Sequence, residues 1–156
     1  MAIVDLETIP QVNLAFMDSD HREEGRLINA LGEAVVALRD GRGSPGDVQK
    51  RFAALDAHTH AHFAREEAAM ERAGFPPYPV HKAEHDHIVA EMVYEGRWFA
   101  EHRDAERLWA YVSQAVPTWL IGHVESMDLV TARFLAARAA RPRPVTATRR
   151  VRLSRG

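Results

Sequence analysis

One stretch of the sequence, residues 60–85, contains two pairs of potential metal ligands at helical spacing. His62 and Glu66 are four residues apart, and so are His81 and His85. Because an α-helix advances about 100° per residue, side chains four apart project from the same face. The residues between the pairs include GFPPYP, which is typical of a turn. The stretch therefore predicts two antiparallel helices with both pairs facing a common interior.

Apolar residues recur at spacings of three and four, and strand-like alternation of useful length is absent from the sequence. This periodicity is typical of amphipathic helices. We expect helices from about 18–20 to the glycines at 41–43, from 44 to 74, from about 79 to 101–104, and from about 104 to 140. Ser44 is the expected cap of the second helix, and Asp20 with Glu23 that of the first. Pro117 lies inside the last helix and predicts a kink or a break.

Four amphipathic helices joined by short turns predict an all-α fold, an antiparallel up-down-up-down four-helix bundle. We assign residues 18–140 to this bundle and residues 1–17 to an N-terminal arm whose apolar side chains lie against it. Residues 141–156 are poor in apolar side chains and interrupted by proline. For them we expect a flexible, disordered tail.

Composition narrows the classes of protein. The chain of 156 residues fits one domain, and without cysteine it has no disulfides, thiolate metal sites or cysteine nucleophiles. The N-terminus lacks a basic segment followed by an apolar run, and no window approaches the ~20 apolar residues of a membrane span. We therefore expect a cytoplasmic protein with no membrane span.

Charge is divided unevenly along the chain. Residues 1–140 contain 14 of the 20 basic residues and all 22 acidic ones, whereas residues 141–156 contain six Arg and no acid. The basic tail could attract an acidic partner, an anionic membrane or nucleic acid. The tail contains no aromatic residue, so we expect it to bind no specific nucleic acid. A tail that only increases solubility explains its charge equally well.

Each predicted helix contributes histidine to its inward stripe, and two of the helices add a carboxylate. The candidate metal ligands are His21, His62, Glu66, His81, His85, His123 and Asp128. A single histidine is more often half-buried or on the surface than a ligand. Burying all seven without a metal would leave polar atoms unpaired at ~1–3 kcal/mol each. Five imidazoles and two carboxylates suit a pair of transition-metal ions. Neutral imidazole favours iron, zinc, copper or nickel over calcium or magnesium, and manganese also remains open.

Asp128 is the one candidate whose position conflicts with a regular helix. It follows His123 by five residues, which on an ideal helix places the two about 140° apart. A π-type turn would bring both to the same face, and such turns favour functional sites. We therefore predict a disturbed hydrogen-bond ladder between residues 123 and 128.

Four ordered segments together resemble the bacterial hemerythrins, relatives of the oxygen carriers hemerythrin and myohemerythrin. The segments are MDSDH ending at His21, HFAREE from His62, HKAEH from His81, and WLIGHVESMD from Trp119 to Asp128. The resemblance covers roughly residues 12–135. One departure is that no tryptophan occurs before Trp98, whereas members of the family often have one in the N-terminal arm.

The resemblance implies a cofactor of two iron ions (Fe2+/Fe3+) with a bridging oxo or hydroxo group. By this resemblance, His81, His85 and His123 would hold a coordinatively saturated iron, His21 and His62 an iron with an open position, and Glu66 and Asp128 would bridge them. Trp119 and Leu120 match a Trp-Leu pair of the family, in which the leucine lines the oxygen pocket.

The function that we expect is reversible binding of dioxygen, as a carrier, store or local oxygen supply, rather than catalysis. Five histidines with only two carboxylates contrast with the carboxylate-rich sites of ferritin-like oxidases. The alternatives are an oxygen or redox sensor module and a di-iron enzyme that reduces nitric oxide or peroxide. The sequence shows no clear proton route or reductant site for such an enzyme. We expect Glu67 and Glu84 to be solvated rather than ligating, and His58 to lie on the surface, with a place at the edge of the site as its alternative.

Overall fold

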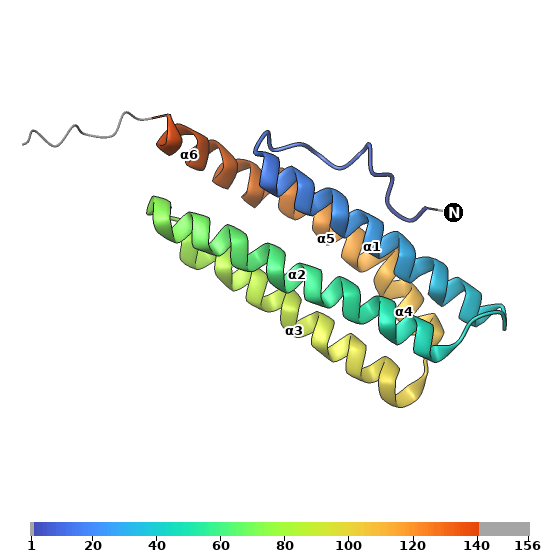
Figure 1. The fold of residues 1–156 in the computed structure, drawn as a ribbon. Coiled ribbons are helices and arrows are strands. Elements are labelled where there is room, and N and C mark those ends of the chain that lie inside the picture. The colour runs from blue at the N-terminus through green and yellow to red at the C-terminus, as the bar shows by residue number, and fades with distance from the viewer. Residues whose placement is uncertain (1, 141–156) are drawn as a thin grey trace, which may run out of the picture.

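The computed structural model describes residues 2–140 and arranges them as four antiparallel rods (Figure 1). Three rods are single helices, α1 (Ala15–Arg39), α2 (Pro45–Ala73) and α3 (Tyr78–His102). The fourth rod runs through α4 (Ala105–Ala110), η1 (Tyr111–Ala115), α5 (Val116–His123), η2 (Val124–Asp128) and α6 (Leu129–Ala139), where η1 and η2 are π-helical turns. No strand occurs within residues 2–140. The prediction of an all-α four-helix bundle is confirmed, and the predicted tail lies outside the described residues.

The second helix begins and ends as its sequence predicts. The hydroxyl of Ser44 accepts a hydrogen bond from the backbone N–H of Asp47 (3.2 Å), and Pro45 occupies the first helical position. Gly74 ends the helix in the left-handed conformation, with φ 64°, which glycine adopts without steric cost.

The predicted cap at Asp20 is wrong. Helix α1 begins earlier, at Ala15, and Asp20 lies inside it with its side chain against Arg65 of α2. The two Arg65–Asp20 hydrogen bonds measure 2.8 and 2.6 Å. Asp18 accepts instead from the backbone N–H of Val12 (2.7 Å), which fixes the arm against the start of α1. The Asp20 side chain, which local sequence rules assign to a helix cap, thus forms a tertiary ion pair with Arg65 instead.

The N-terminal arm runs alongside α1 on the outside of the bundle (Figure 1). The side-chain amide of Asn29 makes three hydrogen bonds of 2.8 Å to the backbone of Ile3 and Val4. Val4, Ile9 and Val12 are buried in the same hydrophobic core as the helices. The arm therefore seals one side of the bundle.

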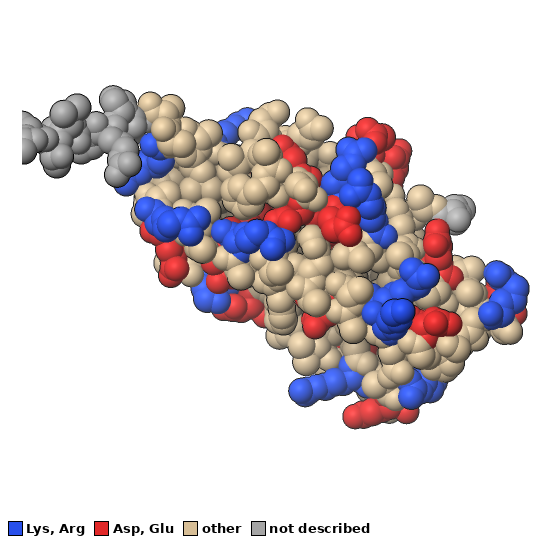
Figure 2. Space-filling view, viewed as in Figure 1, with Lys and Arg blue, Asp and Glu red and all other residues tan. Residues whose placement is uncertain are grey.

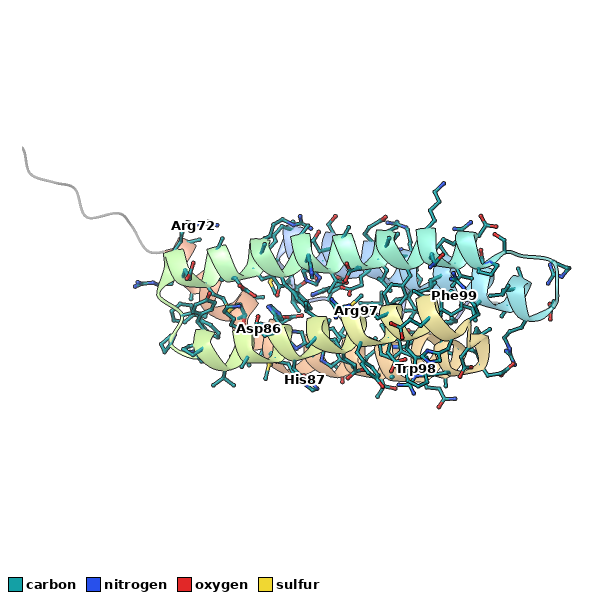
Figure 3. The ribbon with its side chains drawn as sticks, turned by 90° about the horizontal axis from the view of Figure 1, so that it is seen from below. Arg72, Asp86, His87, Arg97, Trp98 and Phe99 are labelled. Atoms are coloured by element: carbon teal, nitrogen blue, oxygen red, sulfur yellow. The ribbon has the colours of Figure 1, made fainter. Side chains whose placement is uncertain are left out.

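The interior is divided along its length. In α2, the buried side chains of the first half are apolar, beginning with Val48 and Phe52, whereas His62 and Glu66 are buried in the second half. The apolar half of the bundle holds the rods together, and the polar half holds the candidate ligands. In Figure 3 the side chains of α2 and α3 fill the space between the two rods.

The sequence predicted a kink or a break at Pro117. The fourth rod is not broken there. The π-helical turn η1 directly precedes α5, and the backbone N–H of Val116 bonds to the carbonyl of Tyr111. The wider turn changes the hydrogen-bond register just before the proline, which has no N–H to donate. The helical rod therefore continues toward His123.

The surface visible over α1 and α2 intersperses Lys and Arg with Asp and Glu (Figure 2). Among the helices of residues 2–140, none is both long and apolar enough to cross a lipid bilayer.

Candidate metal centre

The structure brings all seven predicted ligand side chains together inside the polar half of the bundle. They come from all four rods, and each is at most 5% exposed: His21, His62, Glu66, His81, His85, His123 and Asp128. Their potential ligand atoms form two groups that share Glu66, one with the three histidines of α3 and α5, the other with the two of α1 and α2. This is the arrangement expected of two neighbouring ion sites.

The carboxylate of Glu66 divides its two oxygens between these groups. Its Oε1 lies 2.9 Å from His62 Nε2 and 3.7 Å from His21 Nε2. Its Oε2 lies 3.8 Å from His81 Nε2 and 3.5 Å from His85 Nε2. One oxygen therefore faces each group of imidazoles, as a carboxylate that bridges two cations must.

The carboxylate of Asp128 is divided in the same way. Its Oδ2 lies 3.0 Å from His21 Nε2, on the two-histidine side. Its Oδ1 lies 3.2 Å from both His81 Nε2 and His123 Nε2, on the three-histidine side. The π-helical turn η2 spans Val124–Asp128, so the predicted disturbance of the helix between residues 123 and 128 is confirmed. The extra residue in that turn points Asp128 inward.

The donor set fits a metal because the protein alone leaves its atoms unpaired. Buried side-chain atoms without a hydrogen-bond partner among the described residues include His21 Nδ1 and Nε2, Glu66 Oε2, His85 Nε2, and both carboxylate oxygens of Asp128. Leaving such atoms unsatisfied costs ~1–3 kcal/mol each. Two cations between the two histidine groups would satisfy most of them together, since neutral imidazole and carboxylate are transition-metal ligands.

Three of the five histidines have a polar side chain near Nδ1, the ring nitrogen that faces away from the centre. His62 Nδ1 lies 2.9 Å from a carboxylate oxygen of Glu24. His81 Nδ1 lies 2.9 Å from Thr131 Oγ1, and His85 Nδ1 lies 3.2 Å from Glu67 Oε1. Such partners fix the ring so that Nε2 faces the centre and make the imidazole a stronger donor to a metal.

Two of these partners were not identified from the sequence, and the role of a third was predicted only in part. Glu24 is buried on α1, three residues after His21, and also accepts from Thr59 (3.0 Å). Glu67 belongs to none of the candidate ligand groups, in line with its prediction, but it is only half-exposed and contacts His85 instead of facing solvent alone. The spacing of Glu24 from His21 was the available signal for its inward orientation.

Glu84 and His58 also differ from the solvated surface role predicted for them. Glu84 accepts a hydrogen bond from Trp119 Nε1 (2.8 Å), so it orients a side chain of the centre's wall. His58 is half-buried, with Nε2 3.0 Å from the carbonyl oxygen of Asp20. Each contact joins two consecutive rods through residues that are far apart in the sequence.

Trp119 and Leu120 lie beside the centre in different ways. Leu120 is 1% exposed within the hydrophobic core. Trp119 is half-buried, and its ring stacks on His123 with centroids 4.6 Å apart and an interplanar angle of 19°. The role of the pair in an oxygen pocket stays a prediction.

Without a cation, protons stabilise the cluster. Burial lowers the pKa of His62, but the carboxylates of Glu24 and Glu66 outweigh this and raise it to about 10. Burial likewise opposes protonation of His21, while Asp128 and Glu66 raise its pKa to about 9. Burial raises the pKa of Asp128, but the neighbouring imidazoles of His123, His21 and His81 lower it well below its ordinary range.

The model of one protein family, described as the hemerythrin HHE cation binding domain, matches residues 12–135. The chain belongs to the hemerythrin family. The resemblance drawn from the four sequence segments is therefore confirmed, and the buried cluster of histidines and carboxylates fits the cation binding that the family description names.

Two bacterial relatives align with most of this hemerythrin. It is 35% identical over 124 residues to the bacteriohemerythrin of Ralstonia nicotianae, covering 80% of this chain and 82% of the relative. It is 32% identical over 132 residues to the bacteriohemerythrin of Aquifex aeolicus, covering 81% of this chain and 93% of the relative.

Solved structures share the fold. The crystal structure of a leucine-to-tyrosine mutant of hemerythrin superposes with a TM-score of 0.72 at 22% identity, covering 87% of this chain and 99% of that chain. A crystal structure of a leucine-to-phenylalanine mutant gives the same values. Both neighbours confirm the four-helix bundle.

Proposed function

We propose that this hemerythrin holds two iron ions and binds dioxygen reversibly, as a carrier, a store or a local oxygen supply. The observation that supports this most is the divided geometry of the two carboxylates. Glu66 and Asp128 each direct one oxygen toward the two-histidine group and the other toward the three-histidine group. Membership of the hemerythrin family and the bacteriohemerythrin relatives agree with it.

The proposal assigns the residues unequally between the ions. One ion would take His81, His85 and His123, the other would take His21 and His62, and both would share Glu66 and Asp128. The ion with fewer imidazoles keeps a position for a small molecule, within an interior where His21 and Glu66 are fully buried.

When bound, the iron pair would supply the two electrons that reversible dioxygen binding requires. The chain's own residues keep the site rigid and dry. Glu24 holds His62 with Nε2 toward the centre, and Thr131 does the same for His81. Leu120 and Val124 are buried beside the site and exclude water. With only two carboxylates, the donor set stabilises high-valent iron less than carboxylate-rich oxidase sites do, which favours binding over oxygenation.

Metal analysis combined with optical spectroscopy tests this function. Purified protein should contain two irons per chain. An absorption band should appear with air and disappear under argon, through repeated cycles. Irreversible oxidation in air without an oxygenated species would overturn the proposal and favour an enzyme or a sensor. Loading with zinc or manganese in place of iron would overturn it as well.

A further inference from the structure

We infer that the groove between α3 and the fourth rod is a docking surface for a basic one-electron carrier protein, which reduces the iron pair through Trp119. This inference rests on the proposed function, because a centre that cycles between Fe2+ and Fe3+ needs electrons whenever it is left oxidised. The groove, the aromatic path and the charge distribution support it in turn.

The groove has a volume of about 770 Å3 and runs along α3 opposite η1 and α5. Its walls include Glu84, Ile88 and Glu91 from α3, and Tyr111, Thr118 and Trp119 from the fourth rod. His87 also lines it, and Figure 3 shows His87 on the side of α3 that faces away from α2. The groove is therefore separate from the α2–α3 contact that frames the metal centre.

Trp119 connects this groove to the candidate ligands. It lines the groove, and its ring stacks on His123 at a centroid distance of 4.6 Å. Its edge also meets Phe63 (5.9 Å), whose ring stacks on His85 at 3.8 Å with an interplanar angle of 0°. One half-buried indole thus reaches His123 directly, and it reaches His85 and His62 through a single phenyl ring.

The aromatic path leads most closely to the three-histidine group. His123 and His85, on which Trp119 and Phe63 stack, both belong to this group, the ion expected to have no open position. Phe63 also lies 5.2 Å, between ring centroids, from His62 of the two-histidine group, in a tilted rather than a stacked arrangement. The stacked contacts therefore favour entry of the electron at the three-histidine group.

The charges of the groove select a basic partner. Glu95 is occupied by two hydrogen bonds from Arg107, of 2.8 and 2.6 Å. Among the described residues, Glu84 and Glu91 have no Lys or Arg partner, and Glu91 lies 4.0 Å from His87 Nε2. Residues 1–140 contain 22 acidic and 14 basic residues, so the field of the body also favours a cationic partner. Complementary charge of this kind raises association rates and orients the docked partner.

Tyr111 lines the floor of the groove with its hydroxyl buried beneath the surface. Tyr111 is 7% exposed, and its hydroxyl has no hydrogen-bond partner among the described residues. Burial, followed by the negative charges of Glu91 and Glu95, raises the pKa of Tyr111, so the hydroxyl keeps its proton.

The redox step would be a one-electron exchange. The carrier would lose one electron and be oxidised, and one ferric ion would gain it and become ferrous. Two encounters would restore the diferrous pair, and no covalent bond would form between the partners. Trp119 would lie on the electron route, between the docked carrier and the ring of His123 on which it stacks.

Stopped-flow reduction of the iron-loaded, oxidised full chain tests the route, with hexaammineruthenium(II) as a cationic probe. Glu91→Gln should slow the reduction several-fold at low salt and weaken its salt dependence. Glu33→Gln, the same charge change at an exposed position on α1, should not. Trp119→Leu should reduce the rate to a small fraction of the wild-type rate at equal iron content. Equal rates in Glu91→Gln and Glu33→Gln would overturn the proposal.

Binding to the groove can be measured without redox chemistry. In zinc-loaded full chain, the redox-inert hexaamminecobalt(III) should shift the NMR signal of the Trp119 indole N–H, which is bonded to Glu84, and leave that of Trp109 unchanged. Glu91→Gln should weaken the shift. Equal shifts at both indoles, or none, would overturn the docking surface even if dioxygen binding is reversible. Failure of dioxygen binding with an intact Trp119 shift would refute the proposed function alone.

Discussion

His123 Nε2 lies 3.2 Å from Asp128 Oδ1, although five residues separate the two along one helical rod. On a regular α-helix the side chains would point about 140° apart. The π-helical turn η2 adds a residue to the turn between them and places both on the inner face. The local irregularity of the fourth rod thus supplies the second carboxylate that faces both histidine groups.

Asp128→Ala should reduce the iron content from two ions per chain to one or none. The variant loses the oxygens that face His21 and His81, so each ion would lose a ligand. Glu125→Ala is the matched control, because Glu125 is an exposed acid in the same π-helical turn. Metal analysis after identical reconstitution measures the difference. Equal iron content in the two variants would remove Asp128 from the ligand set.

Glu24→Gln should weaken iron binding without abolishing the fold. The amide keeps the shape of the side chain but not the charge that faces His62 Nδ1. Loss of such an outer partner typically costs about 10–100-fold in metal affinity. Competition with a chelator measures this loss, with Glu23→Gln, the adjacent and more exposed acid, as the control. Unchanged chelator resistance in Glu24→Gln would show that Glu24 does not support the centre.

The pKa shifts predict how the stability of the metal-free protein depends on pH. The pKa values of His62 and His21 are raised from 6.5 to about 10 and about 9. Their contribution is fully present below pH 6.5 and lost as pH rises toward these values. The pKa values of Glu66 and Asp128 are lowered from 4.5 and 3.8, so their contribution is lost as pH falls below about 4.5.

The midpoint of urea unfolding of metal-free protein should therefore be highest between about pH 4.5 and 6.5 and fall toward pH 10. His62→Gln should flatten the alkaline side of this profile, because it removes the group with the most strongly raised pKa. A midpoint that increases from pH 7 to pH 10 would contradict the ion-paired state of the empty cluster.

The sequence contained enough information for the helices and their inward faces, because those depend on periodicity within each helix. It also predicted the irregular turn before Asp128, since the conflict between spacing and direction is visible along one rod. The seven candidate ligands lie together because their helical faces could be read one by one.

The outer partners could not be predicted in the same way. Glu24 and His62 are 38 residues apart, and their contact depends on how α1 and α2 are aligned. Asp20 follows a local capping pattern, yet the approach of Arg65 decides its role. Glu67 lies off the inward stripe of α2, which predicts a solvated side chain. Only the packing of α3 against α2 places His85 beside it. Each of these wrong or missing predictions concerns a contact between two helices, which rules about a single helix cannot predict.

The two helical glycines Gly96 and Gly122 give a matched test of the packing between α2 and α3. A methyl group on Gly122 would meet open space, so Gly122→Ala should raise the free energy of unfolding by about 0.5–1 kcal/mol through helix propensity. A methyl group on Gly96 would lie 2.8 Å from a ring carbon of Phe52. That overpacking costs about 1–3 kcal/mol and should offset or exceed the same propensity gain.

Urea unfolding of iron-loaded protein would therefore place Gly96→Ala about 1–3 kcal/mol below Gly122→Ala in free energy of unfolding. Gly96→Ala/Phe52→Leu should recover part of the difference, because the smaller side chain no longer meets the added methyl group. If Gly96→Ala were as stable as Gly122→Ala, the close contact between the two rods would be absent in solution. The rigid α2–α3 frame that aligns Glu66 with His85 would then lose its support.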